Sequence, residues 1–195
     1  MTKRRIRIAS AVFAVALLAV AVTAAVGGGG ESRSRPSAAF EWLHPSSPPA
    51  GWKVARTAGG ATFAYPPGWR PIKTDPGTAS VALFGSAGRI EGFLNATPRQ
   101  GAETLANWSR FRPQHNSGEG DRHERIVAST TNARFRAGHG SCVIDTYATS
   151  KAAYREIACL VAGKRSTAVM VAAAPNALWG RQAATLERAM SSFVP

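Results

Sequence analysis

Cysteines and acidic residues are both scarce in this chain of 195 residues. It holds 2 cysteines, and 11 Asp and Glu stand against 24 Lys and Arg, which gives a formal net charge of +13. Cys142 and Cys159 do not form a Cys-x-x-Cys pair, and the chain has neither a Gly-rich phosphate loop nor a Walker pattern. The common thiol-redox and nucleotide-binding motifs are therefore excluded. The basic residues are scattered rather than gathered in a run, so no nucleic-acid partner is predicted.

One long apolar segment, from Ile8 to Val26, contains no charged residue. As a helix it would span roughly 28 Å, which is close to the thickness of the hydrocarbon core of a bilayer. Four basic residues precede it and place the N-terminus in the cytoplasm and the remainder outside: Lys3, Arg4, Arg5 and Arg7. Its length favours an uncleaved single-pass anchor in the cell membrane. A cleaved signal peptide, which would leave a secreted protein, is the alternative.

The composition divides the chain into three parts. Residues 1–27 form the signal anchor or signal peptide, and 28–51, rich in Gly, Ser and Pro, are predicted to be a flexible tether. The island Phe40-Glu41-Trp42-Leu43 interrupts this tether, and it could dock on the domain, touch the membrane interface or bind another protein. Residues 52–195 are long enough to form one globular domain with a sizeable core.

Alternating polarity and turn residues predict an α+β domain. The first hairpin pairs 52–56 with 61–65 around Gly59-Gly60. A helix is predicted from about Ala102 to a stop at Pro113, followed by a polar loop from Gln114 to Asp121. A closing helix carries an apolar stripe: Trp179, Ala183, Leu186, Met190 and Phe193. Further strands are predicted at 81–84, 90–94, 126–128, 133–136, 142–147, 154–159 and 167–173.

The two cysteines lie on a predicted hairpin. If its turn is centred on Ser150-Lys151, Cys142 stands directly opposite Cys159, with Cβ atoms near enough for a bridge. Two cysteines in an exported domain are usually oxidised, so we predict a structural disulfide. A pair of buried thiols is the alternative.

Two stretches resemble the PsbP-like family. Phe63-Ala64-Tyr65-Pro66-Pro67-Gly68-Trp69 is similar to its opening strand and turn, and the segment 186–193 resembles its closing helix. The family includes photosystem accessory proteins, relatives of a Ran-binding nuclear import factor and small bacterial exported proteins. The resemblance implies an antiparallel sheet sandwiched by helices over 52–195, and a binding or accessory role without catalysis. No metal-binding residue of the photosystem members is carried over.

Two predicted loops contain candidate residues for chemistry. One predicted loop could gather ligands around a metal, but the spacing matches no standard site: His115, Glu119, Asp121 and His123. Ser141 follows Gly138-His139-Gly140, yet a nucleophile elbow needs Gly two residues before and after the Ser, where His139 and Val143 stand.

A third candidate is the pair of carboxylates on the cysteine hairpin. Asp145 and Glu156 face each other in the register that joins the cysteines, and two opposed carboxylates could serve acid–base chemistry. Arg155 and Arg136 could neutralise them instead. No catalytic, cofactor-binding or metal-binding residue is assigned, and no cofactor is predicted.

The hypothesis for function is therefore a membrane-tethered, extracytoplasmic binding or accessory domain without catalytic activity. Its expected partners are the membrane, through the N-terminal helix, and an envelope protein. The alternatives are a small cell-envelope hydrolase and a basic binder of anionic envelope polymers, because a positive surface raises encounter rates with polyanions.

Overall fold

The computed structural model describes residues 38–195. The predicted anchor at 8–26 and the first part of the predicted tether, 28–37, lie outside the described residues. In the described part, no helix is long and apolar enough to cross a bilayer.

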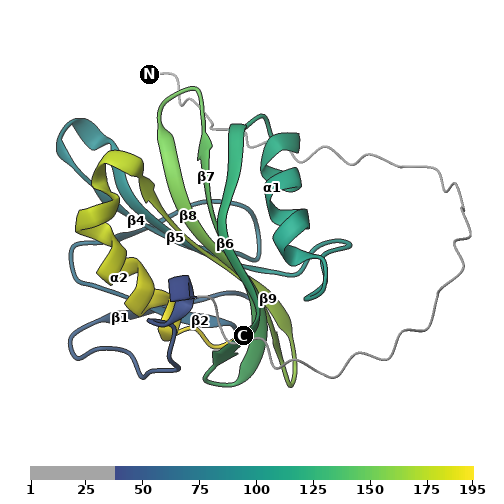
Figure 1. Ribbon diagram of the computed structural model, residues 1–195. Coiled ribbons are helices and arrows are strands. Elements are labelled where there is room, and N and C mark those ends of the chain that lie inside the picture. Colours follow the sequence, from purple (N-terminus) through teal and green to yellow (C-terminus); the bar gives the residue numbers. More distant parts are fainter. Residues whose placement is uncertain (1–37) are drawn as a thin grey trace, which may run out of the picture. The chain divides into compact units, whose positions relative to one another are not determined.

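Seven antiparallel strands form the central sheet, in the order β3-β4-β5-β9-β8-β7-β6 (Figure 1). Every neighbouring pair in this sheet is antiparallel. Long strands occupy the centre and one edge, while the opposite edge is short. The strands are β3 (Arg70–Ile72), β4 (Ala79–Phe84), β5 (Ile90–Pro98), β6 (Arg122–Phe135), β7 (Gly138–Ala148), β8 (Ala153–Gly163) and β9 (Thr167–Pro175).

A separate hairpin of β1 (Lys53–Arg56) and β2 (Thr62–Tyr65) confirms the predicted first turn. The C-terminus holds this hairpin in place. Thr62 forms an isolated bridge with Val194, and the amide of Ala64 donates to the Ser192 hydroxyl at 2.9 Å.

Helices cover both sides of the sheet, as Figure 1 shows. Helix α2 (Trp179–Ser191) packs on β9, β5 and β2, whereas α1 (Trp108–Gly118) packs on β6, β7 and β8. Alternate residues of each strand therefore enter two different cores, one with Cys142 and Ile157 and the other with Val143 and Ala158. The predicted α+β class, with an antiparallel sheet between helices, is confirmed. Three short 3-10 helices complete the elements: η1 (Ala38–Phe40), η2 (Ser86–Gly88) and η3 (Asn176–Leu178).

The apolar island at 40–43 belongs to the α2-side core. Phe40 is 3% exposed and Leu43 is 8% exposed, and both join the cluster that contains Ala133 and Phe135. The amide of Ser46 also bonds to the carbonyl of Ser191 at 3.0 Å. The compact part of the chain therefore begins before Trp52, because these side chains fill the space that α2 leaves over the β6 end of the sheet.

The first long helix differs from its predicted position. Thr104 and Asn107 bond to each other's backbone amides, so 102–107 forms a turn and α1 begins only at Trp108. The helix then continues through Pro113 to Gly118, so the predicted stop at Pro113 and the loop from Gln114 were wrong. Pro113 removes one helical hydrogen bond, but packing of Trp108 against the sheet holds the helix in place.

Strand β6 also differs from the prediction of two separate pieces. It is one strand of 14 residues whose pairing with β7 shifts at three places. Such bulges insert unpaired residues and break the alternation on which the sequence-based prediction relied.

The predicted disulfide between Cys142 and Cys159 is confirmed. The two residues pair directly in the β7–β8 register, with their Cα atoms 4.1 Å apart and both side chains fully buried. The bridge lies on the α2 side and joins β7 to β8, next to the β6 edge of the sheet.

Reduction of this bridge should lower the free energy of unfolding by about 3 kcal/mol, because it closes a loop with a sequence separation of 17. Urea unfolding of the full chain with and without reductant measures the change. The double variant Cys142→Ala/Cys159→Ala is the control and should not respond to reductant. A wild-type midpoint that reductant leaves in place would contradict the bridge.

Candidate functional site

Two carboxylates face each other inside the α1 side of the domain. Asp145 on β7 pairs directly with Glu156 on β8, and they are 0% and 1% exposed. The pairing follows from the same register that aligns the cysteines, which confirms the predicted juxtaposition. Buried carboxylates without compensation are costly, so each needs a partner or a proton.

Glu156 finds its partner on α1. The Nε of Arg112 donates to Oε1 at 2.7 Å and its Nη2 donates to Oε2 at 2.9 Å, which makes a two-pronged ion pair. One turn earlier, the indole nitrogen of Trp108 donates to the carbonyl of Ala158 at 2.9 Å. These two contacts fix α1 on β8, because residues four apart lie on one side of a helix.

The arginines expected to neutralise this pair do not reach it. Arg155 neighbours Glu156 on β8 and therefore points to the opposite side, where its guanidinium lies 5.0 Å from the ring centre of Trp179. Arg136 is exposed in the turn between β6 and β7. The expectation for both residues was wrong because the compensating charge comes from a helix that lies far away in the sequence.

Asp145 has no hydrogen-bond partner on either carboxylate oxygen. Burial, and then the charge of Glu156, raise the pKa of Asp145 to about 8. Arg112 acts in the opposite direction but is already bonded to Glu156. Asp145 therefore carries a proton at neutral pH. The three side chains Arg112, Asp145 and Glu156 then hold one cation and one anion rather than one cation and two anions.

Glu124 on β6 extends this cluster. Both of its carboxylate oxygens are buried without a partner, and burial followed by the charge of Asp121 raises its pKa to about 7. Burial and the charge of Glu156 likewise raise the pKa of Tyr147 above its usual range. Burial alone would lower the pKa of Arg112, but the charge and hydrogen bonds of Glu156 raise it above the usual range.

The two opposed carboxylates of this cluster are closed to solvent. A pocket of about 420 Å³ lies beside it, lined by residues 119–123 and 148–150. Asp121 belongs to this lining, whereas Asp145 and Glu156 do not. A substrate in the pocket would therefore not contact the two opposed carboxylates.

The four residues weighed as metal ligands lie at the end of α1 and the start of β6. His115 and Glu119 form a half-exposed pair at 3.3 Å, which lowers the pKa of Glu119, and His115 stacks on Phe111. Asp121 and His123 follow, and His123 adopts a left-handed backbone (φ 59°) where β6 first shifts its register. Across residues 38–195, no three His, Cys, Asp or Glu side chains are grouped so that they could hold a metal ion.

Ser141 is not set up as a nucleophile. It is buried on the α1 side, and its hydroxyl donates to the carbonyl of Leu105 in the turn before α1. His139 is exposed two residues earlier. This hydrogen bond therefore attaches the turn before α1 to β7.

Comparison with known structures identifies the fold. The described architecture is similar to the solution structure of cyanobacterial PsbP (CyanoP) from Synechocystis sp. PCC 6803, with a TM-score of 0.56 and 14% identity, covering 74% of this chain and 92% of that one. The chain has a PsbP-like fold. The predicted resemblance is therefore confirmed for the fold, and at this level of identity the likeness shows the fold alone.

Weaker structural similarities include two other bacterial proteins. A Pseudomonas aeruginosa protein of unknown function has a TM-score of 0.49 and 11% identity, over 74% of this chain and 96% of that one. LpqN, involved in cell envelope biogenesis of Mycobacterium tuberculosis, has a TM-score of 0.45 and 10% identity, over 70% of this chain and 84% of that one. No family model matches the chain, and no curated protein matches it in sequence.

Sequence reasoning missed two members of the cluster. Arg112 lies inside the predicted helix but carried no predicted role, and Glu124 lies between the predicted loop that ends at Asp121 and the predicted strand at 126–128. A charged residue four positions after a buried Trp on the same helix is the signal that could have found Arg112. Glu124 had no comparable signal, because the bulge in β6 decides where its side chain points.

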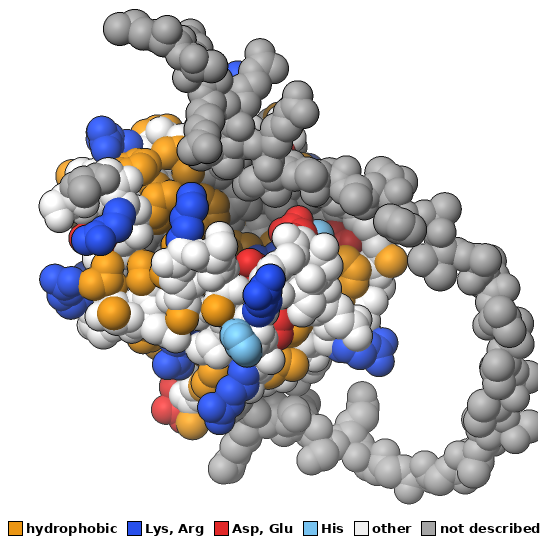
Figure 2. Space-filling view, turned by 90° about the horizontal axis from the view of Figure 1, so that it is seen from above, with side chains coloured by type: hydrophobic (Ala, Val, Ile, Leu, Met, Phe, Trp, Pro, Cys, Tyr) orange, Lys and Arg blue, Asp and Glu red, His pale blue; other side chains and the backbone are white. Residues whose placement is uncertain are grey.

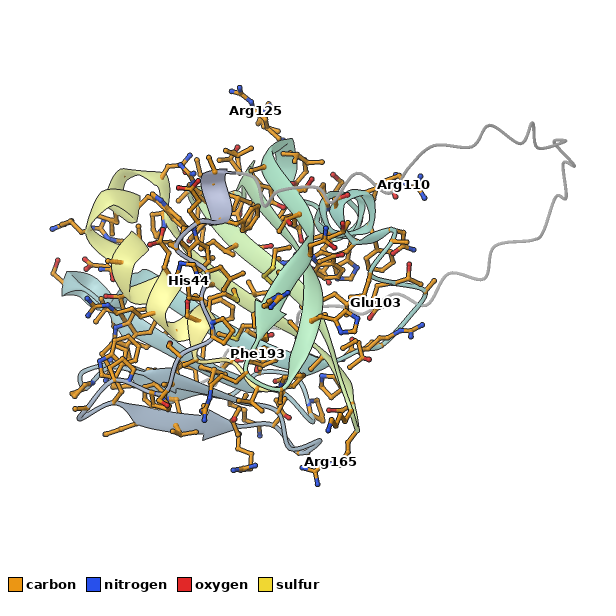
Figure 3. The ribbon with its side chains drawn as sticks, turned by 60° about the horizontal axis from the view of Figure 1, so that its bottom comes forward. His44, Glu103, Arg110, Arg125, Arg165 and Phe193 are labelled. Carbon is orange, nitrogen blue, oxygen red and sulfur yellow. A yellow bond between two sulfur atoms is a disulfide. The ribbon has the colours of Figure 1, made fainter. Side chains whose placement is uncertain are left out.

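Replacing Arg112 should leave Glu156 buried without a partner. We expect Arg112→Met to lower the free energy of unfolding by about 3–5 kcal/mol at pH 8, and the double variant Arg112→Met/Glu156→Gln to recover much of the loss. Arg110→Met is the matched control, because Arg110 is exposed on the same helix (Figure 3). Equal urea midpoints for the two single variants would disprove a buried ion pair.

The proton on Asp145 should make stability depend on pH. Its pKa is about 8 in the folded protein against an ordinary value of 3.8, so the folded state binds more protons than the unfolded state between these values. Stability should therefore fall as pH rises from about 4 to about 8. Asp145→Asn should flatten this decline, with a remainder from Glu124. Urea unfolding across this pH range measures both profiles, and parallel profiles would refute the assignment.

Proposed function

We propose that this chain is a membrane-tethered, extracytoplasmic binding or accessory domain that performs no catalysis. The observation that carries the proposal is the closure of the two opposed carboxylates, Asp145 and Glu156, to solvent. Glu156 is bonded to Arg112, and Asp145 is enclosed beside it, and neither lines the neighbouring pocket. A hydrolase needs its acid and base within hydrogen-bond reach of a bound substrate.

The chain length between the predicted anchor and the domain supports a position at the membrane. The apolar run ends at Val26 and the packed segment begins by Phe40, so few residues separate them. Residues 27–37 can extend over at most about 40 Å, since a fully extended chain advances at most about 3.6 Å per residue. The domain would therefore work close to the bilayer surface. The buried disulfide suits this location, because such bridges persist outside the reducing cytoplasm.

A second candidate, a binder of anionic envelope polymers, is favoured by how folding distributes charge. Among residues 38–195, three acidic residues are buried, namely Glu103, Asp145 and Glu156, whereas Arg112 is the one Lys or Arg that forms an ion pair with them. The described surface is therefore more basic than the composition suggests. Figure 2 shows the Lys and Arg side chains spread over one face rather than gathered in a patch. Positive charge spread in this way favours a weak attraction to anionic polymers, and added salt would reduce it.

Photo-crosslinking of the full chain in intact cells tests the proposed function. A photoreactive residue is placed at exposed positions on three elements, replacing Arg110 on α1, Thr131 on β6 or Arg181 on α2. We expect at least one position to give an adduct of a single, discrete mass with an envelope protein. A ladder of polymer adducts that disappears with added salt would support the second candidate instead.

Turnover assays complete this test. The purified full chain should hydrolyse no ester, amide or glycosidic envelope substrate. Hydrolysis that Glu156→Gln or His123→Gln abolishes and the exposed control Lys151→Gln retains, together with an absence of adducts from all three positions, would replace the proposal with a hydrolase.

A further inference from the structure

We infer that the β6 edge of the sheet binds an acidic, extended segment of a partner protein by strand addition. This inference rests on the proposed binding function and names the surface and the chemistry of the partner. It follows from four features of β6: its position and length, its exposed apolar side chains, the groove beside it and its charge.

The two edges of the seven-stranded sheet are built differently. β3 has only three residues with Pro71 in the middle, and a proline cannot donate a ladder hydrogen bond, so this edge is closed to a further strand. β6 has 14 residues and no proline, and among the described strands it pairs only with β7. Its outer backbone groups therefore remain available to an added strand.

Apolar side chains gather on the β6 edge. Ile126 and Val127 are 47% and 46% exposed, and among the described residues only Val54 on β1 is a comparably exposed large apolar side chain. A strand added along 128–130 and continued past the register shift between Ile126 and Ala128 would cover these two side chains and remove them from water. Their exposure on an edge strand is otherwise unfavourable for a monomer.

A groove lies along the other half of the same strand. It has a volume of about 650 Å³, and its lining includes Thr130 and Ala133 on β6 and Phe40 and Leu43 in the N-terminal segment. The register of β6 with β7 is uninterrupted at 128–130 and again at 133–135, with a bulge between. An added strand can therefore pair along 128–130 and place side chains in the groove where the bulge bends β6 away.

The positive charge of β6 favours a negatively charged partner segment. Arg122, Arg125 and Arg134 are exposed, and Arg125 projects from the strand in Figure 3. The one acidic residue of the strand, Glu124, has both carboxylate oxygens buried. Glu41 contributes one carboxylate to the groove lining, which leaves the edge positive. A partner segment that alternates acidic and apolar residues matches this edge in both charge and polarity.

Binding of a synthetic peptide to the full chain in detergent micelles tests the inference. The probe is a fluorescent peptide of alternating Glu and Val, about eight residues long, and anisotropy reports its binding. The same peptide with alternate backbone nitrogens methylated is the backbone control, because it keeps the side chains but cannot form both sets of strand hydrogen bonds. We expect methylation, and replacement of Glu by Lys, each to weaken binding by about tenfold or more.

Matched variants locate the binding surface. Arg125→Glu/Arg134→Glu should weaken binding by about tenfold, whereas Arg110→Glu/Arg181→Glu, with the same charge change on the helices, should alter it less than about twofold. Ile126→Asp should weaken binding, and Val54→Asp, a comparably exposed residue on β1, should not. Urea unfolding confirms that each variant is folded.

Several outcomes would overturn the inference. The methylated peptide could bind as well as the parent, or the β6 and helix variants could lose binding equally. Binding to phosphatidylglycerol vesicles that only the β6 variants lose, without peptide binding, would assign the edge to the membrane. A concentration-dependent dimer that the β6 variants dissolve would assign it to a second copy. Crosslinks from Arg110 or Arg181 alone would retain the proposed function and reject this surface.

Discussion

The register between β7 and β8 is the constraint on which the rest of the domain depends. Directly opposed residues of antiparallel strands point to the same side, so one alignment brings Cys142 to Cys159 on the α2 side and Asp145 to Glu156 on the α1 side. A slip of one residue would turn every side chain of one strand to the opposite side. The disulfide and the carboxylate pair are thus two consequences of the same strand pairing. The covalent bond stabilises the register that also places the two carboxylates opposite each other.

The side chains buried on the two sides of the sheet differ in polarity. The α2 side is apolar, and α2 and the segment around Phe40 cover it together. The α1 side contains charge, and the helix lies where Trp108 and Arg112 both reach β8. One guanidinium cannot compensate two carboxylates, so Asp145 takes up a proton instead. This polar interior makes the α1 side more sensitive to pH than the α2 side.

The proposed function depends more on the edges of the sheet than on its interior. The interior polar groups are enclosed, and Pro71 blocks the short edge at β3. The long β6 edge is left with exposed apolar and basic side chains, beside a groove that the N-terminal segment helps to form. A domain of this kind would present a surface to a partner while its interior supplies rigidity.

The sequence by itself determined the class of fold, the first hairpin, the β7–β8 register and the disulfide. These depend on alternation and turn residues, which act between neighbours in the chain. The tertiary structure decided where α1 begins, that β6 is one continuous strand and which arginine binds Glu156. The Arg112–Glu156 contact joins residues 44 apart in the sequence. The bulges in β6 interrupt the alternation of inward and outward side chains, so the sequence pattern does not reveal a single strand. Local patterns cannot specify such contacts, because packing of distant elements selects them.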